Sequence, residues 1–143
     1  MAVLVDAGPL YAYVDADDRH HQASLELLLE HPGPLVVPVL VITEVVHLIG
    51  TRLGVAAEVR FLGDLASGDF AIESVDAGDW LRIAELVAQY GDLALGTVDA
   101  SVVAAAERLG ITQIATLDRR HFSVVRPSHV ASFELLPRTL RAV

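Results

Sequence analysis

The chain has 143 residues, close to the usual size of one folded domain, and we expect a single domain over residues 1–143. It contains no cysteine, which excludes disulfide frameworks, thiolate nucleophiles and zinc–sulfur sites. Its formal net charge of −9 argues at first against a nucleic-acid partner, because generic nucleic-acid binders are basic.

The hydrophobic pattern predicts short strands that alternate with helices. Residues 2–5 are an apolar, largely β-branched run, which is typical of a buried strand in a parallel sheet. In chain order the predicted elements are strand 2–5, helix 9–13, helix 17–31, strand 35–37, helix 38–53, helix 55–66, strand 70–75, helix 76–90, helix 97–109, strand 113–116, a turn at 119–122, and strand-like pieces at 124–125 and 133–136.

This alternation requires crossover connections between the strands. We therefore predict the α/β class, a three-layer α/β/α sandwich with a mostly parallel central sheet. In the helix at 76–90, the helical spacing of Trp80, Ile83 and Val87 predicts that these three side chains form its buried side.

No apolar run is long enough for a membrane span, since Glu44 and His47 interrupt the longest one, residues 35–49. The first residues carry no basic segment and reach Asp6 at once, unlike a signal peptide. We expect a cytoplasmic protein that has no membrane partner.

Two aspartates follow predicted strands, the position at which ligands bind in open α/β sheets. Asp6 follows the first strand, and Asp118 follows the strand at 113–116. Either residue alone could be a turn former or a helix cap. The agreement of the two positions favours a site at this edge of the sheet.

Two more acids lie on predicted helices. Glu44 stands among apolar neighbours, so we expect it to be largely buried and to need a partner, either an arginine or a bound cation. Asp99 lies in the first turn of an apolar helix, where the helix dipole by itself favours a carboxylate. Together with Asp6 and Asp118 they would form an oxygen-only cluster suited to Mg²⁺ or Mn²⁺.

Other polar residues have weaker signals. The six histidines include no pair at a spacing of three or four, and we do not expect them to bind the metal. Residues 119–143 hold five arginines and one acid. Arg119 and Arg120, directly after Asp118, could bind RNA phosphates beside the acidic cluster, or the whole segment could be a solvated basic tail.

Other metal-dependent or nucleotide-binding α/β classes fit poorly. Phospho-receiver domains and haloacid-dehalogenase-type phosphatases need a lysine, and this chain has none. Neither a glycine-rich dinucleotide fingerprint nor a P-loop is present. An unrelated α/β domain whose acids serve as caps stays open.

Four segments, at residues 3–10, 42–45, 98–101 and 114–122, occur in the order and at about the spacing found in PIN domains. Over nearly its whole length the chain resembles the VapC-type toxins of that family, the ribonuclease halves of type II toxin–antitoxin pairs. The resemblance implies a parallel α/β/α sandwich, a Mg²⁺ or Mn²⁺ cofactor, endonuclease activity on RNA, a homodimer, and a co-expressed antitoxin.

Position by position, the resemblance assigns the family's acidic quartet to residues that match its motifs: Asp6, Glu44, Asp99 and Asp118. Asp6 and Asp99 match the firmest metal ligands. Thr116 matches a hydroxyl position near the site, and Asp92 matches an acid found in part of the family, a possible outer-shell residue. The alternative is a PIN-like module that binds RNA or protein without cleaving, against which the presence of all four acids argues.

Overall fold

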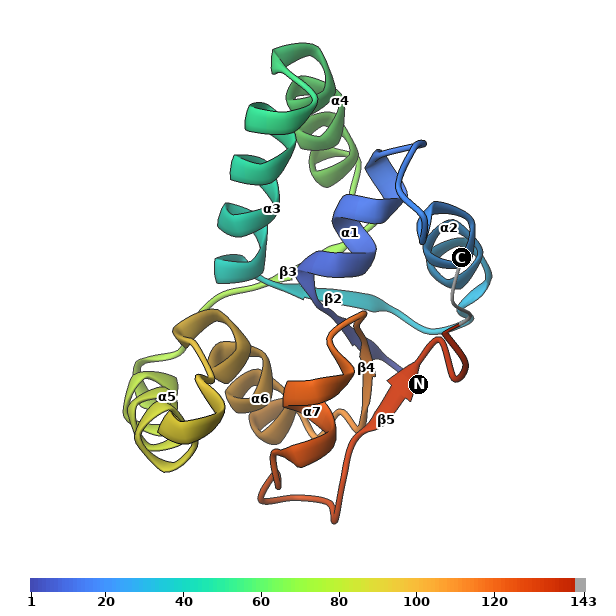
Figure 1. Cartoon of the computed structure of the whole chain (residues 1–143). Helices are drawn as coiled ribbons and strands as arrows, with labels where there is room; N and C mark the ends of the chain where they lie inside the picture. The colour runs from blue at the N-terminus through green and yellow to red at the C-terminus, as the bar shows by residue number, and fades with distance from the viewer. Residues whose placement is uncertain (141–143) are drawn as a thin grey trace.

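The computed structural model describes residues 1–140 and places a sheet of five strands between two layers of helices (Figure 1). Arg141, part of the basic C-terminal segment, lies outside the described residues. In chain order the elements are β1 (Val3–Val5), α1 (Ala7–Val14), α2 (His21–Glu30), β2 (Leu35–Pro38), α3 (Val39–Arg52), α4 (Val55–Ala66), β3 (Ala71–Glu73), α5 (Ala77–Gln89), the 3₁₀ turn η1 (Gly91–Leu93), α6 (Thr97–Leu109), β4 (Gln113–Ala115), α7 (Arg119–Val124) and β5 (Glu134–Leu136).

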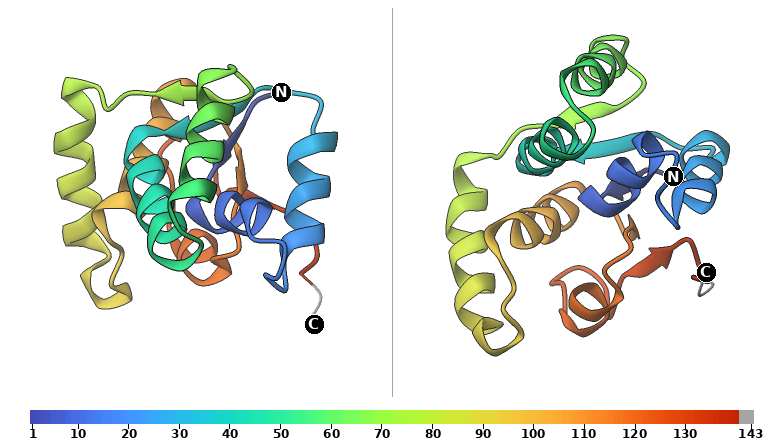
Figure 2. Two further views of the ribbon diagram at one scale, coloured as in Figure 1. Left: turned by 90° about the horizontal axis from the view of Figure 1, so that it is seen from above. Right: turned by 45° about the horizontal axis from the view of Figure 1, so that its top comes forward.

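The strand order is β3-β2-β1-β4-β5, and every neighbouring pair is parallel. The central strand β1 is fully buried, and its Val3 pairs with Leu35 of β2 on one side and Gln113 of β4 on the other. Figure 2 shows α1 to α4 together on one side of the sheet and α5 to α7 on the other. The predicted α/β/α sandwich is confirmed.

The topology creates a crevice beside the central strand. The chain moves from β1 through β2 to the edge strand β3, then returns through α5 and α6 to β4 on the other side of β1. The helices that follow β1 and those that precede β4 therefore cover opposite faces, which leaves a crevice beyond the carboxyl ends of these two strands. Asp6 directly follows β1, and Asp118 lies three residues after β4.

Several predicted details are wrong. Helix α2 begins at His21, because the carboxylate of Asp18 accepts a hydrogen bond from the His20 backbone N–H in a preceding turn. Val124 ends helix α7 and forms no strand with Val125. Trp80 is 51% exposed, since α5 packs mainly against α6 and leaves the side of the helix that carries Trp80 uncovered.

An ion-pair network anchors α6, the helix that carries Asp99. Arg108 in its last turn donates to Asp79 at 3.0 Å and to Glu73 at 2.8 Å, and so connects α6 to the start of α5 and the end of β3.

Within residues 1–140 no helix has the length and the apolar character that crossing a membrane requires.

Candidate active site

Asp6 lies at the end of β1 with only 6% of its surface exposed. It occupies the N-cap position of α1, yet its side chain makes no capping hydrogen bond. Its Oδ2 accepts instead from the hydroxyl of Thr116 at 2.9 Å. Capping therefore does not explain this carboxylate, whose position after a buried strand directs it into the crevice.

Burial raises the pKa of Asp6 from 3.8 to about 7. The nearby carboxylates of Asp99 and Glu44 raise it further, while bonds from the Ala7 backbone N–H and the Thr116 hydroxyl lower it. A cation between these carboxylates would reverse the balance, because it favours their charged forms. The raised pKa of Asp6 shows that its negative charge is unfavourable here, and a bound cation would relieve this cost.

Thr116 connects the two strand ends and is fully buried. Its hydroxyl donates to Asp6 and accepts from the backbone N–H of Asp118, both at 2.9 Å. The hydroxyl donates its one proton to Asp6 and accepts through an oxygen lone pair from Asp118, so it can form both hydrogen bonds at once. Thr116 thus connects the side chain of Asp6 with the backbone of Asp118.

Asp99 in the first turn of α6 and Asp118 at the N-cap of α7 lie on either side of His121. The Nδ1 atom of His121 is 2.8 Å from a carboxylate oxygen of each aspartate. Carboxylates that are ionised only accept, so Nδ1 carries a hydrogen and acts as donor. Burial raises the pKa of Asp99, and the hydrogen bond from His121 opposes that rise.

Asp118 also serves as a helix cap, since its Oδ1 accepts from the His121 backbone N–H at 3.1 Å. Asp99, Asp118 and His121 each offer one possible ligand atom, and these three atoms lie within 4.8 Å of one another. His121 was not predicted to join the site, because no second histidine lies three or four residues from it. The spacing of three between Asp118 and His121 at a helix start was the signal that could have found it.

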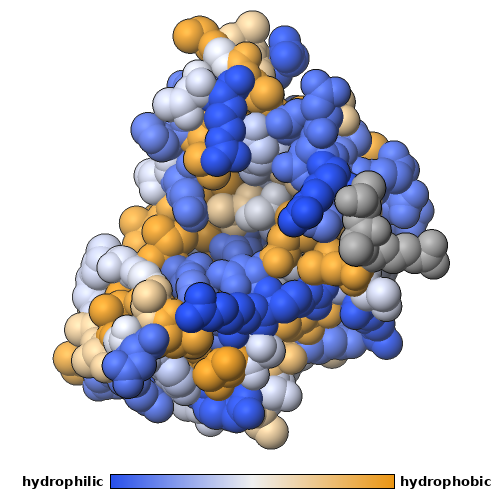
Figure 3. All heavy atoms as spheres, in the orientation of Figure 1, coloured by the Kyte–Doolittle hydropathy of each residue, from blue (hydrophilic) through white to orange (hydrophobic). Residues whose placement is uncertain are grey.

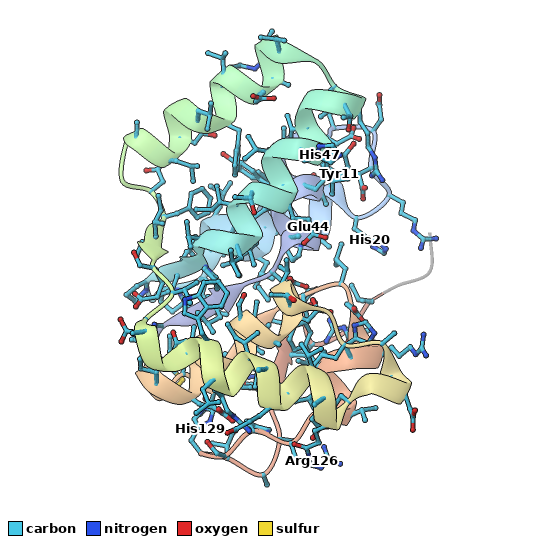
Figure 4. All side chains as sticks on the ribbon, turned by 90° about the vertical axis from the view of Figure 1, so that its left-hand side faces the viewer. Tyr11, His20, Glu44, His47, Arg126 and His129 are labelled. Atoms are coloured by element: carbon cyan, nitrogen blue, oxygen red, sulfur yellow. The ribbon has the colours of Figure 1, made fainter. Side chains whose placement is uncertain are left out.

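Glu44 projects from α3 into the space between the two helical layers (Figure 4). It is exposed, so the expectation of a largely buried carboxylate is wrong. Partial burial of its carboxylate and the charge of Asp99 still raise the pKa of Glu44, which places it at the edge of the acidic group.

The four predicted acids line one open cleft of about 430 Å³, visible as a hollow between α3 and α1 on one side and α6 and α7 on the other (Figure 3). It is bordered by residues of α1, α3 and α6 and of the segments after β1, α1 and β4: Asp6, Ala7, Gly8, Tyr11, Asp18, Glu44, Leu48, Arg52, Asp99, Leu117 and Asp118. Four elements that are distant in the sequence thus bring the predicted carboxylates together.

Besides the buried Thr116, three predicted residues lie outside this lining. Arg119 donates through its guanidinium to the backbone carbonyl of Pro137, and partial burial lowers its pKa. Arg120 is exposed on α7, and Asp92 is exposed in η1. None of the three borders the cleft, so the structure directs Arg119 in particular away from the position expected of a phosphate ligand.

The PIN domain family model matches residues 3–126, which cover most of the chain and all four acids. The chain belongs to the PIN domain family. Ribonuclease VapC26 of Mycobacterium tuberculosis is 36% identical to this PIN domain over 135 residues, which make up 94% of this chain and all of that protein.

Solved structures share the fold of this PIN domain at lower identity. VapC20 of Mycobacterium tuberculosis, a toxin that cleaves the sarcin–ricin loop, superposes with a TM-score of 0.77 at 22% identity, over 82% of this chain and 90% of that one. VapBC2 of Rickettsia felis, bound to a fragment of its promoter DNA, gives 0.69 at 14% identity, over 94% and 98% of the chains. A toxin–antitoxin complex of Klebsiella pneumoniae gives 0.59 at 19% identity, over 86% and 92%.

Proposed function

We propose that this PIN domain is a divalent-metal-dependent endoribonuclease and the toxin of a toxin–antitoxin pair. The observation that carries the proposal is the meeting of Asp6, Glu44, Asp99 and Asp118 in one cleft at the carboxyl ends of β1 and β4. The similarity to Ribonuclease VapC26 over the whole of that protein supports RNA as the substrate. A toxin of this kind would act in the cytoplasm, where RNA is present.

The donor set fits Mg²⁺ or Mn²⁺. Carboxylate oxygens are the ligands that these cations prefer, and a cation with several retained waters needs few of them. We assign Asp6 and Asp99 as the main ligands, with Glu44 and Asp118 completing the acidic group. The raised pKa values of Asp6, Glu44 and Asp99 support this assignment, because the carboxylates disfavour their charged forms without a cation.

Asp6, Glu44, Asp99 and Asp118 would hold the cation, which would supply Lewis acidity to the scissile phosphodiester and to the attacking water. The protein's own residues set the geometry. Thr116 fixes the direction of the Asp6 carboxylate, and the backbone N–H of Asp118 bonds the same hydroxyl. The Nδ1 atom of His121 contacts the carboxylates of both Asp99 and Asp118, so these two carboxylates are already positioned before RNA binds.

The proposed role as a toxin also implies protein partners. We extend the proposal to an antitoxin, whose arginine would reach the acidic floor of the cleft and compete with the metal for the same carboxylates. Helix α4 exposes apolar side chains at one-turn spacing, Val55, Val59 and Leu62, and such a surface favours a protein partner. A homodimer, implied by the resemblance, remains a prediction.

The purified chain should cleave total RNA with Mn²⁺ and lose this activity in chelator. Asp99→Asn should lower the cleavage rate by at least about 100-fold, because a metal-held electrostatic contribution is lost. Asp69→Asn, the same charge change at an exposed residue outside the cleft, is the matched control. RNA binding without cleavage in Mn²⁺ would favour the non-catalytic binding module instead.

A further inference from the structure

The cleft extends beyond the four acids toward Tyr11 and Arg52. Glu44, Leu48 and Arg52 follow one another at intervals of four residues along α3, so they lie on one face of the helix, and all three line the cleft. The eight residues from Glu44 to Arg52 correspond to about 12 Å along the helix axis. Arg52 therefore lies within the cleft but beyond the reacting centre.

Tyr11 holds the guanidinium of Arg52 in place. The Arg52 Cζ atom lies 5.1 Å from the centroid of the Tyr11 ring, a cation–π contact. The ring itself is buried, and its hydroxyl donates to Asp15 Oδ2 at 2.7 Å, which fixes its orientation. Within residues 1–140 no carboxylate oxygen lies within 4.0 Å of the Arg52 guanidinium, and the charge of Asp15 attracts it from a longer distance.

A structural role explains only part of this arrangement. Arginine in the last turn of a helix is favoured by the helix dipole, which accounts for Arg52 being near the end of α3. The dipole does not select the face of the helix. Arg52 takes the face that lines the cleft, and it is the basic member of a described lining that contains five carboxylates, those of Asp6, Asp18, Glu44, Asp99 and Asp118.

This charge distribution matters for an anionic substrate. A metal offsets the carboxylates at the reacting centre, but a strand of RNA brings further phosphates into the same cleft. A guanidinium binds phosphate oxygens through two parallel N–H bonds, and a guanidinium held on an aromatic ring loses less freedom when it does so.

We propose that Arg52, held by Tyr11, binds a phosphate that flanks the scissile phosphate of the RNA substrate. The proposal rests on the ribonuclease function proposed above and defines a second contact of that site with RNA. An antitoxin carboxylate would be a rival occupant. RNA is favoured because Arg52 lines the same cleft as the acids, and an RNA strand that reaches the acids carries further phosphates beside the scissile one.

The main test compares Arg52→Gln with Arg60→Gln, an identical charge change on the neighbouring helix α4, where Arg60 lines a different cavity. In Mn²⁺, Arg52→Gln should raise KM for an RNA oligonucleotide about 10-fold or more with a smaller change in kcat, since a charge-assisted contact is lost. The slope of log(kcat/KM) against log salt should fall by about 0.7, the value for one phosphate on a single strand.

Two further variants separate charge from placement. Arg52→Lys should keep the salt slope but bind RNA less tightly, because an ammonium lacks the planar fork. Tyr11→Phe keeps the ring but loses the bond to Asp15 that orients it, so it should weaken RNA binding less than Arg52→Gln does. Melting curves of Arg52→Gln should match the wild type, since Arg52 is exposed.

Anisotropy of a labelled RNA oligonucleotide provides a readout that needs no cleavage. In the Asp99→Asn background with Mn²⁺, adding Arg52→Gln should weaken RNA binding, and adding Arg60→Gln should not. Equal effects of the two arginine variants, or none from Arg52→Gln, would overturn the inference, and so would a loss of antitoxin affinity alone. A wild-type chain that binds RNA through Arg52 but cleaves nothing would instead contradict the proposed ribonuclease function.

Discussion

The buried carboxylate of Asp6 should make the metal-free protein less stable as the pH rises. Its pKa is about 7 in the folded chain, against 3.8 for an aspartate that is free in solvent, as in the unfolded chain. Folding therefore favours the protonated form. The free energy of unfolding is unaffected by Asp6 below about pH 4, decreases between about pH 4 and pH 7, and stays reduced above that range.

The size of the effect follows from the pKa difference. A rise of about three units, at about 1.36 kcal/mol per unit, makes the ionised Asp6 cost about 4 kcal/mol. Asp6→Asn removes this cost. The amide Oδ1 can still accept from Thr116, but the bond that the carboxylate accepts from the Ala7 N–H is lost, which costs about 1 kcal/mol. The net gain for metal-free Asp6→Asn above neutral pH is then about 3 kcal/mol.

Urea unfolding in chelator at about pH 5 and about pH 8 measures this gain. The stabilities of Asp6→Asn and wild type should nearly coincide at the lower pH and differ by about 3 kcal/mol at the higher. Exposed Asp69→Asn is the control and should follow the wild type at both. A saturating level of Mn²⁺, about 100 times its Kd, should stabilise wild type by about 2.7 kcal/mol and Asp6→Asn by less. If Asp6→Asn is less stable than wild type at the higher pH, Asp6 is a structural residue and the electrostatic reasoning is wrong.

Three more predictions concern the residues around Asp6. Thr116→Val should cost about 1–3 kcal/mol of stability, because the buried Asp6 and the half-buried N–H of Asp118 lose their bonds, and it should shift the onset of Mn²⁺ binding to higher pH in calorimetry, since the Thr116 bond lowers the pKa of Asp6. His121→Leu should lower metal-free stability by about 1–2 kcal/mol, whereas His121→Asn, whose amide nitrogen can occupy the Nδ1 position, should restore most of it; equal losses would indicate packing alone. The affinity of an antitoxin C-terminal segment, measured by isothermal titration, should fall with Glu44→Gln combined with Asp118→Asn and with excess Mn²⁺; indifference to both would place inhibition away from the active site.

The sequence alone determined the order of the elements and the edge of the sheet where the acids meet. Local hydrophobic periodicity is a property of neighbouring residues, so strands at residues 2–5 and 35–37 and the helix at 97–109 were predictable from it. In a parallel sheet the carboxyl ends of the strands share one edge. Asp6 and Asp118 therefore had to lie near each other once both followed strands of the same sheet.

Tertiary structure decided which side of each element is covered. The spacing of Trp80 predicts a buried side chain. The neighbouring helix α6, however, covers a narrower part of α5 than the hydrophobic pattern indicates, and Trp80 is exposed. Glu44 has apolar neighbours in sequence, yet it faces an open cleft. Periodicity reports which residues share a face of a helix, but only the packing of distant elements determines whether that face meets a protein surface or water.

The same limit explains the residues that complete the site. His121 meets Asp99 across 22 positions of sequence, and Arg52 reaches the ring of Tyr11 from another helix. Arg119, beside the acid it was expected to assist, turns instead toward Pro137. A side chain's partner is set by the direction in which its backbone points it and by what the fold brings within a few ångströms. Proximity in sequence determined neither this direction nor these neighbouring groups. The crossover connections around β1 determined both.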